Sequence, residues 1–229
     1  MENLECENFV MISSLIKITN APLSYHPIRS VYTHQERFDQ TIETIESVRK
    51  NIPNSYVCLI DCSYFTQNEL DTLSKNCNVI INLYDDLYMR QVLRYSKSKS
   101  LCEALQTLSV IEFIKKNNIK FKNFFKITGR YKLNEGFDYS SYDNDMNVGR
   151  IQSDMQNYFI TSFYKLTPQS LYDLERVFNI QEYKLCLYAG TAYEEIFKIF
   201  MASQPNTKYL DHPIGIDEYI SVNGQLRKQ

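Results

Sequence analysis

The chain has 229 residues, which corresponds to one large domain or two small ones and suffices to bury a full hydrophobic core. A net charge of −2 and a pI near 6.0 provide no overall basic field, so composition excludes recruitment of nucleic acid or an anionic membrane by bulk charge. Six scattered cysteines without a Cys-x-x-Cys pair predict free thiols in a reducing cytoplasm and no zinc site. Acidic residues precede the first apolar run, which is too short to span a bilayer, so we expect neither a secretory signal nor a transmembrane segment.

Strand and helix patterns alternate over the first part of the chain. Short apolar runs rich in β-branched and aromatic residues predict strands at 10–18, 56–60, 79–83 and 124–128. Apolar residues at helical spacing predict helices at 36–50, 66–76 and 101–116. Thr66 and Glu69 form a capping box at the start of the second helix, and the polar segment 85–99 is expected to be irregular or weakly helical. Such alternation is typical of βαβ units, so we expect an α/β fold with a mostly parallel central sheet flanked by helices.

The pattern changes in the second part of the chain. Residues 148–152 and 158–164 are typical of a β-hairpin, and Thr167-Pro168 begins a helix because proline is favoured at the first helical position. A further helix is expected at 191–202, and later elements are a strand near Tyr209 and a turn at Asn223-Gly224. No repeat or interdomain linker interrupts the chain, so we expect a single domain over residues 1–229.

The strand at 124–128 ends in Thr128-Gly129-Arg130. In an open α/β sheet, ligands bind at the carboxyl ends of the strands, so a hydroxyl, a glycine and a guanidinium at this point are suited to contact an anion. The same residues are also explained by a buried strand and a tight glycine turn, with Arg130 on the surface. Residue types alone leave both interpretations open.

Three polar segments lie where the predicted sheet has its carboxyl edge. They are Arg29-Ser30-Val31-Tyr32 with residues 36–49, Lys97-Ser98-Lys99-Ser100 with Glu103, and Lys126-Ile127-Thr128-Gly129-Arg130-Tyr131. Along the chain, an α/β half is followed by a strand-end motif and then by a smaller second half. This order resembles that of the nucleotide-sugar glycosyltransferases of the GT-A type. Within that type, the segments resemble surface-glycan transferases that lack a standard Asp-x-Asp motif.

The resemblance implies a GT-A-like, Rossmann-like fold with a nucleotide-binding half at about 1–133 and an acceptor-side half at about 134–229. It implies a cytoplasmic, hexosyltransferase-like enzyme of glycan biosynthesis that moves a sugar from a nucleotide-diphosphate sugar to a glycan or lipid-linked acceptor. One alternative is a nucleotidyltransferase, although such enzymes usually have a glycine-rich loop after the first strand and residues 19–29 contain no glycine. The other alternative is a non-catalytic nucleotide-sugar-binding domain, because the Asp-x-Asp motif is missing.

The resemblance also implies which residues contact the donor. They lie at or near the predicted carboxyl edge of the sheet and are Arg29, Ser30, Asp61, Asp85, Lys97, Lys99, Ser100, Lys126, Thr128 and Gly129. Simpler explanations stay open for some residues of the same segments. Arg37 lies on the polar face of a predicted helix and is more simply a solvated residue. Ser100 with Glu103 is a capping-box pattern, although lysines beside a positive helix terminus also suit a diphosphate.

Transferases of the GT-A type usually hold a divalent cation with Asp-x-Asp, and Thr128-Gly129-Arg130 occupies that position here. A guanidinium provides charge and bidentate geometry to phosphate oxygens, so Arg130 is expected to stabilise the leaving diphosphate. We therefore expect no metal ligands in the site. The alternative is Mn²⁺ or Mg²⁺ held by Asp143, Asp145 and His212, but Asp143-Asn144-Asp145 is more simply a turn.

Two acidic residues, Glu194 and Glu195, open the helix predicted at 191–202. Inverting GT-A enzymes use an acidic residue at such a helix start to deprotonate the acceptor, and one general base suffices for a single displacement. The two side chains point about 100° apart on a helix, so at most one of them should face the site. Acidic residues in a first turn also simply favour the helix dipole.

Overall fold

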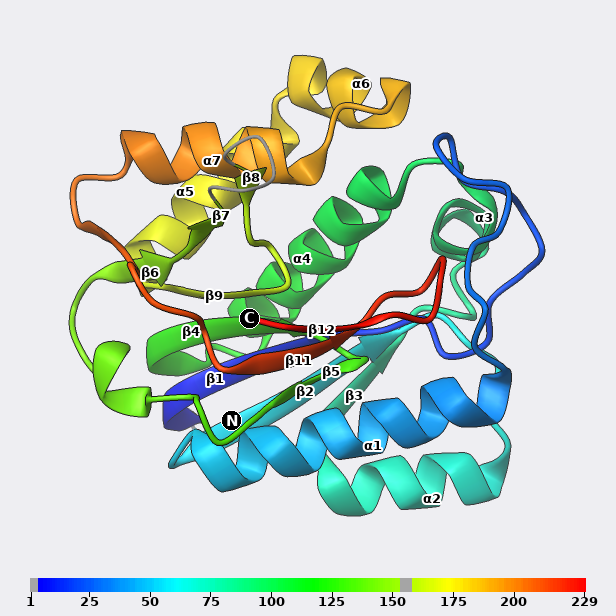
Figure 1. Cartoon of the computed structure of the whole chain (residues 1–229), viewed down its shortest axis with the longest axis horizontal. Coiled ribbons are helices and arrows are strands. Elements are labelled where there is room, and N and C mark those ends of the chain that lie inside the picture. The colour runs from blue at the N-terminus through cyan, green and yellow to red at the C-terminus, as the bar shows by residue number, and fades with distance from the viewer. Residues whose placement is uncertain (1–3, 153–157) are drawn as a thin grey trace.

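The computed structural model describes residues 4–152 and 158–229, whose core is a seven-stranded sheet with helices on both faces (Figure 1). The strand order is β10-β6-β9-β4-β1-β2-β3, and β9 alone in this sheet runs opposite to the others. The strands are β1 (Glu5–Ser13), β2 (Ser55–Asp61), β3 (Val79–Asn82), β4 (Lys120–Thr128), β6 (Asn147–Gly149), β9 (Phe163–Leu166) and β10 (Thr207–Tyr209). The expected α/β class, with a mostly parallel central sheet flanked by helices, is confirmed.

Seven α-helices and one short 3₁₀-helix lie within the described ranges. They are α1 (His34–Asn51), α2 (Gln67–Asn76), α3 (Leu87–Tyr95), α4 (Lys99–Lys116), η1 (Tyr139–Ser141), α5 (Pro168–Asn179), α6 (Gln181–Ala189) and α7 (Tyr193–Ser203). None of these helices has both the length and the apolar character needed to cross a membrane. Figure 1 shows α1 and α2 on one side of the sheet and α4, α5 and α7 on the other.

The alternation of side chains along β1 explains this layering. Successive strand residues point to opposite faces, so Val10 and Ile12 pack with α1 and α2 in one buried cluster. Phe9 and Met11 pack with α4, α5 and α7 in the other. Both clusters are buried, which is why the central strands have continuous apolar runs and lack a polar face.

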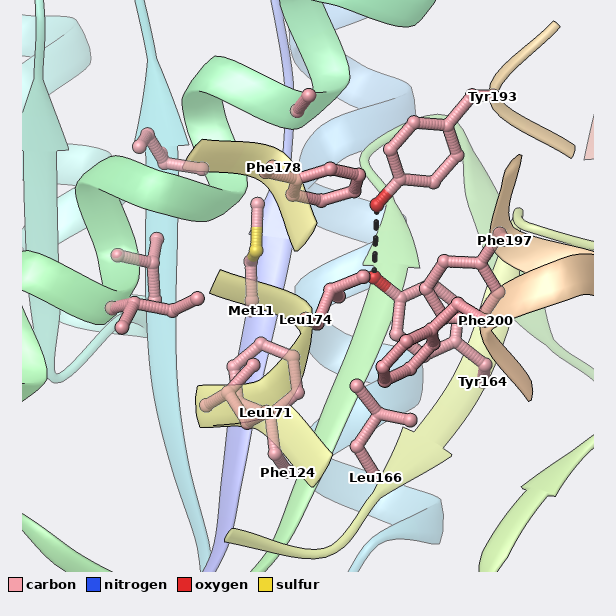
Figure 2. Packing of buried hydrophobic residues seen from close by; sticks show 14 of the residues in the cluster. Met11, Phe124, Tyr164, Leu166, Leu171, Leu174, Phe178, Tyr193, Phe197 and Phe200 are labelled. Atoms are coloured by element: carbon pink, nitrogen blue, oxygen red, sulfur yellow. Dashed lines mark hydrogen bonds between the residues drawn. The ribbon is translucent and has the colours of Figure 1, made fainter. Parts of the chain in front are cut away.

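An aromatic group on the second face fixes the start of α7 (Figure 2). The rings of Tyr164 on β9 and Phe197 on α7 lie 4.3 Å apart, and those of Phe178 and Tyr193 lie 5.4 Å apart. The hydroxyls of Tyr164 and Tyr193 are 3.4 Å apart. Because Tyr193 is the first residue of α7, this packing sets the direction of the residues that follow it.

Two small sheets complete the fold. One joins β7 (Ile151–Gln152) to β8 (Tyr158–Phe159), and the other has the order β12-β11-β5. The members of the second sheet are β5 (Tyr131–Leu133), β11 (Ile216–Tyr219) and β12 (Leu226–Lys228). Since β5 begins directly after Arg130, this sheet brings the C-terminal tail back to the end of β4 (Figure 1).

Most predicted elements are confirmed, although the strand expected at 10–18 is β1 at Glu5–Ser13, and β11 and β12 were not predicted. The segment 85–99 contains α3, which begins because the Asp86 carboxylate accepts a hydrogen bond from the Met89 backbone N–H. The helix α6 was not predicted; it ends at Gly190, whose φ of 105° is the left-handed conformation that favours glycine after a helix.

Candidate functional site

The carboxyl ends of β1 and β4 lie side by side and are held together at Gly129. Ser13 and Thr128 are register partners, and the Gly129 N–H donates to the Ser13 carbonyl at 2.8 Å. A β-carbon on Gly129 would lie 3.0 Å from the Ser14 β-carbon, so glycine fits this approach without a shift. The predicted contact of Gly129 with a donor stays a prediction, but its backbone hydrogen bond fixes the end of β4 directly before Arg130.

Two cavities open at this edge. The larger, of about 620 Å³, is lined by the first turns of α4 and α7, the end of β4, residues 158–162 and parts of the tail. The smaller, of about 100 Å³, is lined by residues after β1, by the start of α1 and by α3 and α4. The two cavities meet at residues that line both, which are Lys99, Glu103, Thr128, Arg130 and Ser221.

The smaller cavity is lined by four basic side chains, which are Arg29, Arg37, Lys99 and Arg130. Arg37 is 3% exposed and donates to the Leu15 carbonyl and the Ser30 hydroxyl. The interpretation of Arg37 as solvated was wrong, because the first turn of α1 packs against the loop after β1. Arg130 Nε is buried and has no hydrogen-bond partner among the described residues. An unpaired buried donor is costly, so this cavity suits an anion with oxygen acceptors.

Lys99 lies in the wall between the two cavities. Burial, together with the positive charges of Arg130 and Arg37, lowers the pKa of Lys99 to about 7, while the negative charge of Glu103 opposes this shift. Lys99 is therefore protonated below about pH 7 and loses its charge as the pH rises through that value. The Lys99 ammonium lies 5.9 Å from the centre of the Tyr25 ring, and both residues line the larger cavity.

We expect the affinity for a nucleoside diphosphate to fall as the pH rises from 6 to 8.5, because Lys99 loses its charge in this window. The change should be about tenfold, the lower end of the range for one charge-assisted contact. Lys99→Arg keeps its charge throughout and should remove this part of the pH dependence. Isothermal titration of the wild type and Lys99→Arg with the same diphosphate at each pH checks this prediction. Protonation of the diphosphate itself affects both proteins equally and cancels in the ratio of their Kd values. Parallel pH profiles would assign the dependence to another group.

The start of α4 differs from the capping box expected at Ser100 and Glu103. Ser98 is the N-cap, and its hydroxyl accepts from the Leu101 N–H at 3.1 Å. Ser100 and Glu103 are consequently free for other contacts, and both line the larger cavity. The Ser100 hydroxyl accepts from the Tyr193 N–H at 3.0 Å, which joins α4 to the start of α7.

Lys126 is buried behind the wall of the site, with 1% of its surface exposed. Its ammonium donates to the Thr161 carbonyl at 2.7 Å, to the Thr128 hydroxyl at 3.1 Å and to Glu103 Oε1 at 3.4 Å. Lys126 does not line either cavity, so the structure gives it a supporting position, and Thr128 lines both. A buried ammonium requires such partners, since an unpaired one costs several kcal/mol.

The two glutamates of α7 lie in different environments. Glu194 lines the larger cavity and accepts from the Thr161 hydroxyl at 3.3 Å. Burial raises the pKa of Glu194, and the negative charge of Glu103 raises it further. Glu195 is exposed and lies 3.4 Å from the Tyr158 hydroxyl. Only Glu194 of this pair faces the site, in agreement with their angular separation on a helix.

Three of the predicted donor contacts hold loops at the edge of the sheet. Arg29 is 6% exposed and donates to the carbonyls of Ala21 and Ser96. Ser30 accepts from Arg37, and the buried Asp61 carboxylate accepts from the Ile16 N–H at 2.9 Å. Of Arg29, Ser30 and Asp61, only Arg29 lines a cavity. Contact of these three with a donor stays a prediction.

Two further predicted contacts are exposed. Asp85 follows β3 and Lys97 precedes α4, and neither lines the two cavities. The Lys97 carbonyl accepts from the Ser24 N–H at 3.0 Å, so this backbone fixes a neighbouring loop. Contact of Asp85 and Lys97 with a donor stays a prediction.

The alternative metal ligands do not come together. Asp143 pairs with Lys122 at 3.0 Å, near the amino end of β4, and Asp145 is exposed beside it. Thr128 lies six positions along β4 from Lys122, so this pair lies about 20 Å from the cavities. The His212 ring contacts the Pro213 carbonyl instead. Among the described residues, no group of three or more His, Cys, Asp or Glu side chains fits a metal ion, so Asp143, Asp145 and His212 do not fit one.

The tail contributes a carboxylate, Glu218, which the sequence offers only as an alternative base together with Asp211 and Asp217. Glu218 lines the larger cavity while fully buried, accepts from the Ser162 hydroxyl at 2.6 Å and pairs with Arg227. No local pattern marks these residues, because the pairing of β11 with β5 and β12 brings them to the site. The Asn223-Gly224 turn, which was predicted, was the one available signal for this hairpin.

Comparison with known proteins finds a similarity in structure but none in sequence. No family model matches the chain, and no curated protein matches it. The structure is similar to that of a glycosyltransferase involved in the glycosylation of the major capsid of PBCV-1. This similarity covers 90% of the present chain and 82% of that chain, with 9% sequence identity and a TM-score of 0.44.

Proposed function

We propose that the chain is a glycosyltransferase that moves a sugar from a nucleotide-diphosphate sugar to a glycan or lipid-linked acceptor, with inversion. One observation carries the proposal. A small cavity lined by Arg29, Arg37, Lys99 and Arg130 joins a larger cavity lined by Glu194, at the carboxyl edge of a mostly parallel sheet. The displacement requires positive charge at the leaving diphosphate and a carboxylate base at the acceptor hydroxyl, and such groups line the two adjoining cavities.

The cations act on the leaving group. Negative charge accumulates on the diphosphate as its bond to the sugar breaks, and fixed positive groups stabilise that charge without reorganising. Arg130 fits this role because its Nε is buried and unpaired among the described residues at the junction of the cavities. Lys99 adds a second charge, and the hydroxyls of Ser100 and Thr128 line the same space.

Glu194 acts on the acceptor. Its carboxylate takes the proton of an acceptor hydroxyl while that oxygen attacks the sugar carbon, so one displacement inverts the configuration. The hydrogen bond from Thr161 orients the carboxylate. A raised pKa brings a carboxylate nearer to the working pH, which favours proton transfer.

Chelation should have little effect on nucleotide binding. Thr128-Gly129-Arg130 has no carboxylate in the position of the usual Asp-x-Asp, so the site binds phosphate with cationic side chains. We expect the Kd for a nucleoside diphosphate to change less than about tenfold on addition of EDTA, which is about 1.4 kcal/mol. Isothermal titration with and without EDTA checks this. Loss of all binding would mean that a cation bridges the diphosphate to carboxylates of this chain.

The function itself is tested in two steps. A thermal-shift screen of nucleoside diphosphates and nucleotide sugars comes first, since a ligand at 100 times its Kd stabilises by about 2.7 kcal/mol. Release of nucleoside diphosphate from the stabilising sugar nucleotide, with and without glycan acceptors, comes second. Binding without turnover would indicate the non-catalytic domain, and release of pyrophosphate from a nucleoside triphosphate and a sugar phosphate would indicate the nucleotidyltransferase. Absence of binding would contradict the proposal.

A further inference from the structure

Glu103 is the carboxylate of the wall that the two cavities share. It lines both, together with Lys99, Thr128, Arg130 and Ser221. Because Ser98 caps α4, Glu103 is not engaged at the helix terminus and its side chain points to the cavities. The cationic cavity lies on one side of this wall and Glu194 lies beyond it on the other.

Glu103 pairs with Lys126, but only the Glu103 carboxylate faces the cavities. Lys126 is 1% exposed, whereas the Glu103 side chain is 28% exposed. The ammonium is held from behind by the Thr161 carbonyl and the Thr128 hydroxyl. One Glu103 oxygen faces Lys126 at 3.4 Å, and a carboxylate has about four acceptor positions, so most of them remain for a ligand.

The chemistry of the proposed function, on which this inference rests, locates the transferred sugar at this wall. The reacting sugar carbon is bonded to the diphosphate and must also be reached by the acceptor oxygen that Glu194 activates. With the diphosphate beside Arg37 and Arg130, the sugar lies between the two cavities. We propose that Glu103 accepts hydrogen bonds from hydroxyl groups of the transferred sugar, and that this sugar is neutral.

Charge explains the restriction to a neutral sugar. Glu103 and Glu194 both face this space, and each Glu103 contact with a hydroxyl is a charge-assisted hydrogen bond. A sugar acid would add a third carboxylate between these two, and like charges brought together are strongly disfavoured. Lys126 offers that carboxylate no compensation, because it is buried behind Glu103. The charges of Lys99 and Arg130, which line the same wall, are offset by the diphosphate of the donor.

The experiment uses matched donors that differ only in oxidation of the primary alcohol. They are UDP-glucose with UDP-glucuronate and GDP-mannose with GDP-mannuronate, each compared with UDP or GDP by isothermal titration. We expect the wild-type protein to bind the neutral member at least about tenfold more tightly. Glu103→Gln should narrow this ratio to less than about threefold while the Kd for UDP or GDP changes little, because an amide removes the charge that repels the acid.

Glu112→Gln, on the exposed side of the same helix, is the control and should keep the wild-type ratio. The glutamine variant retains an acceptor for Lys126, and an unchanged melting temperature checks that it folds. Equal wild-type affinities for the two members, or an unchanged ratio in Glu103→Gln, would overturn the inference while leaving the proposed function intact. If neither UDP, GDP nor any of the four nucleotide sugars binds, both the inference and the proposed function are overturned.

Discussion

Glu194→Gln should lower kcat by about 10²–10⁴-fold while the Kd for the nucleotide stays nearly unchanged. The carboxylate is the proposed base, and an amide cannot take the proton of the acceptor. The amide still accepts from Thr161, so the local structure should persist. Because the pKa of Glu194 is raised, kcat of the wild type should fall as the pH falls through that pKa, where the base becomes protonated. The residual activity of the variant should lack this acidic limb.

Glu195→Gln is the matched control. Glu195 occupies the next position of the same helix turn but is exposed and does not line the cavity. It should retain wild-type kcat and the same pH profile. Equal, small effects of both substitutions would mean that the glutamates only favour the dipole of α7. Of the alternative bases Asp211, Asp217 and Glu218, only Glu218 lines the cavity, and it would be the next to substitute.

Arg130→Ala should weaken binding of the nucleoside diphosphate and lower kcat/KM together. The guanidinium is proposed to contact the diphosphate both before and during the reaction, so ground-state and transition-state stabilisation are lost at once. Loss of one charge-assisted contact corresponds to about 1.5–3 kcal/mol, or roughly 10- to 150-fold in Kd. Isothermal titration and steady-state kinetics on the same preparation measure the two effects.

Two comparisons make the Arg130 result specific. Arg176→Ala removes an exposed arginine of α5 and should leave both quantities unchanged. The positive charge of Arg130 contributes to the low pKa of Lys99, so its removal should move the midpoint of the pH-dependent binding to a higher pH. A normal Kd with reduced kcat in Arg130→Ala would place the guanidinium at the transition state alone.

The sequence by itself determined most of the helices and strands, and the edge of the sheet at which the site forms. Periodicity and capping signals predicted α1, α2, α5 and the central strands, because these signals depend on residues three or four apart. The alternation of those elements predicted the mostly parallel sheet. Thr128-Gly129-Arg130 was recognised because a strand end can be read locally. The separation of Glu194 from Glu195 followed from helix geometry alone.

Only the tertiary structure decided which polar residues meet. Arg37 resembles any solvated helix residue until α1 is packed against the loop after β1. Glu103 resembles half of a capping box until Ser98 takes the cap and Lys126 arrives from β4. Glu218 reaches the cavity through pairing of β11 with β5, more than 80 residues away in the chain. These contacts join distant segments, and no periodic or capping signal encodes them, because such signals act only between neighbours along the chain.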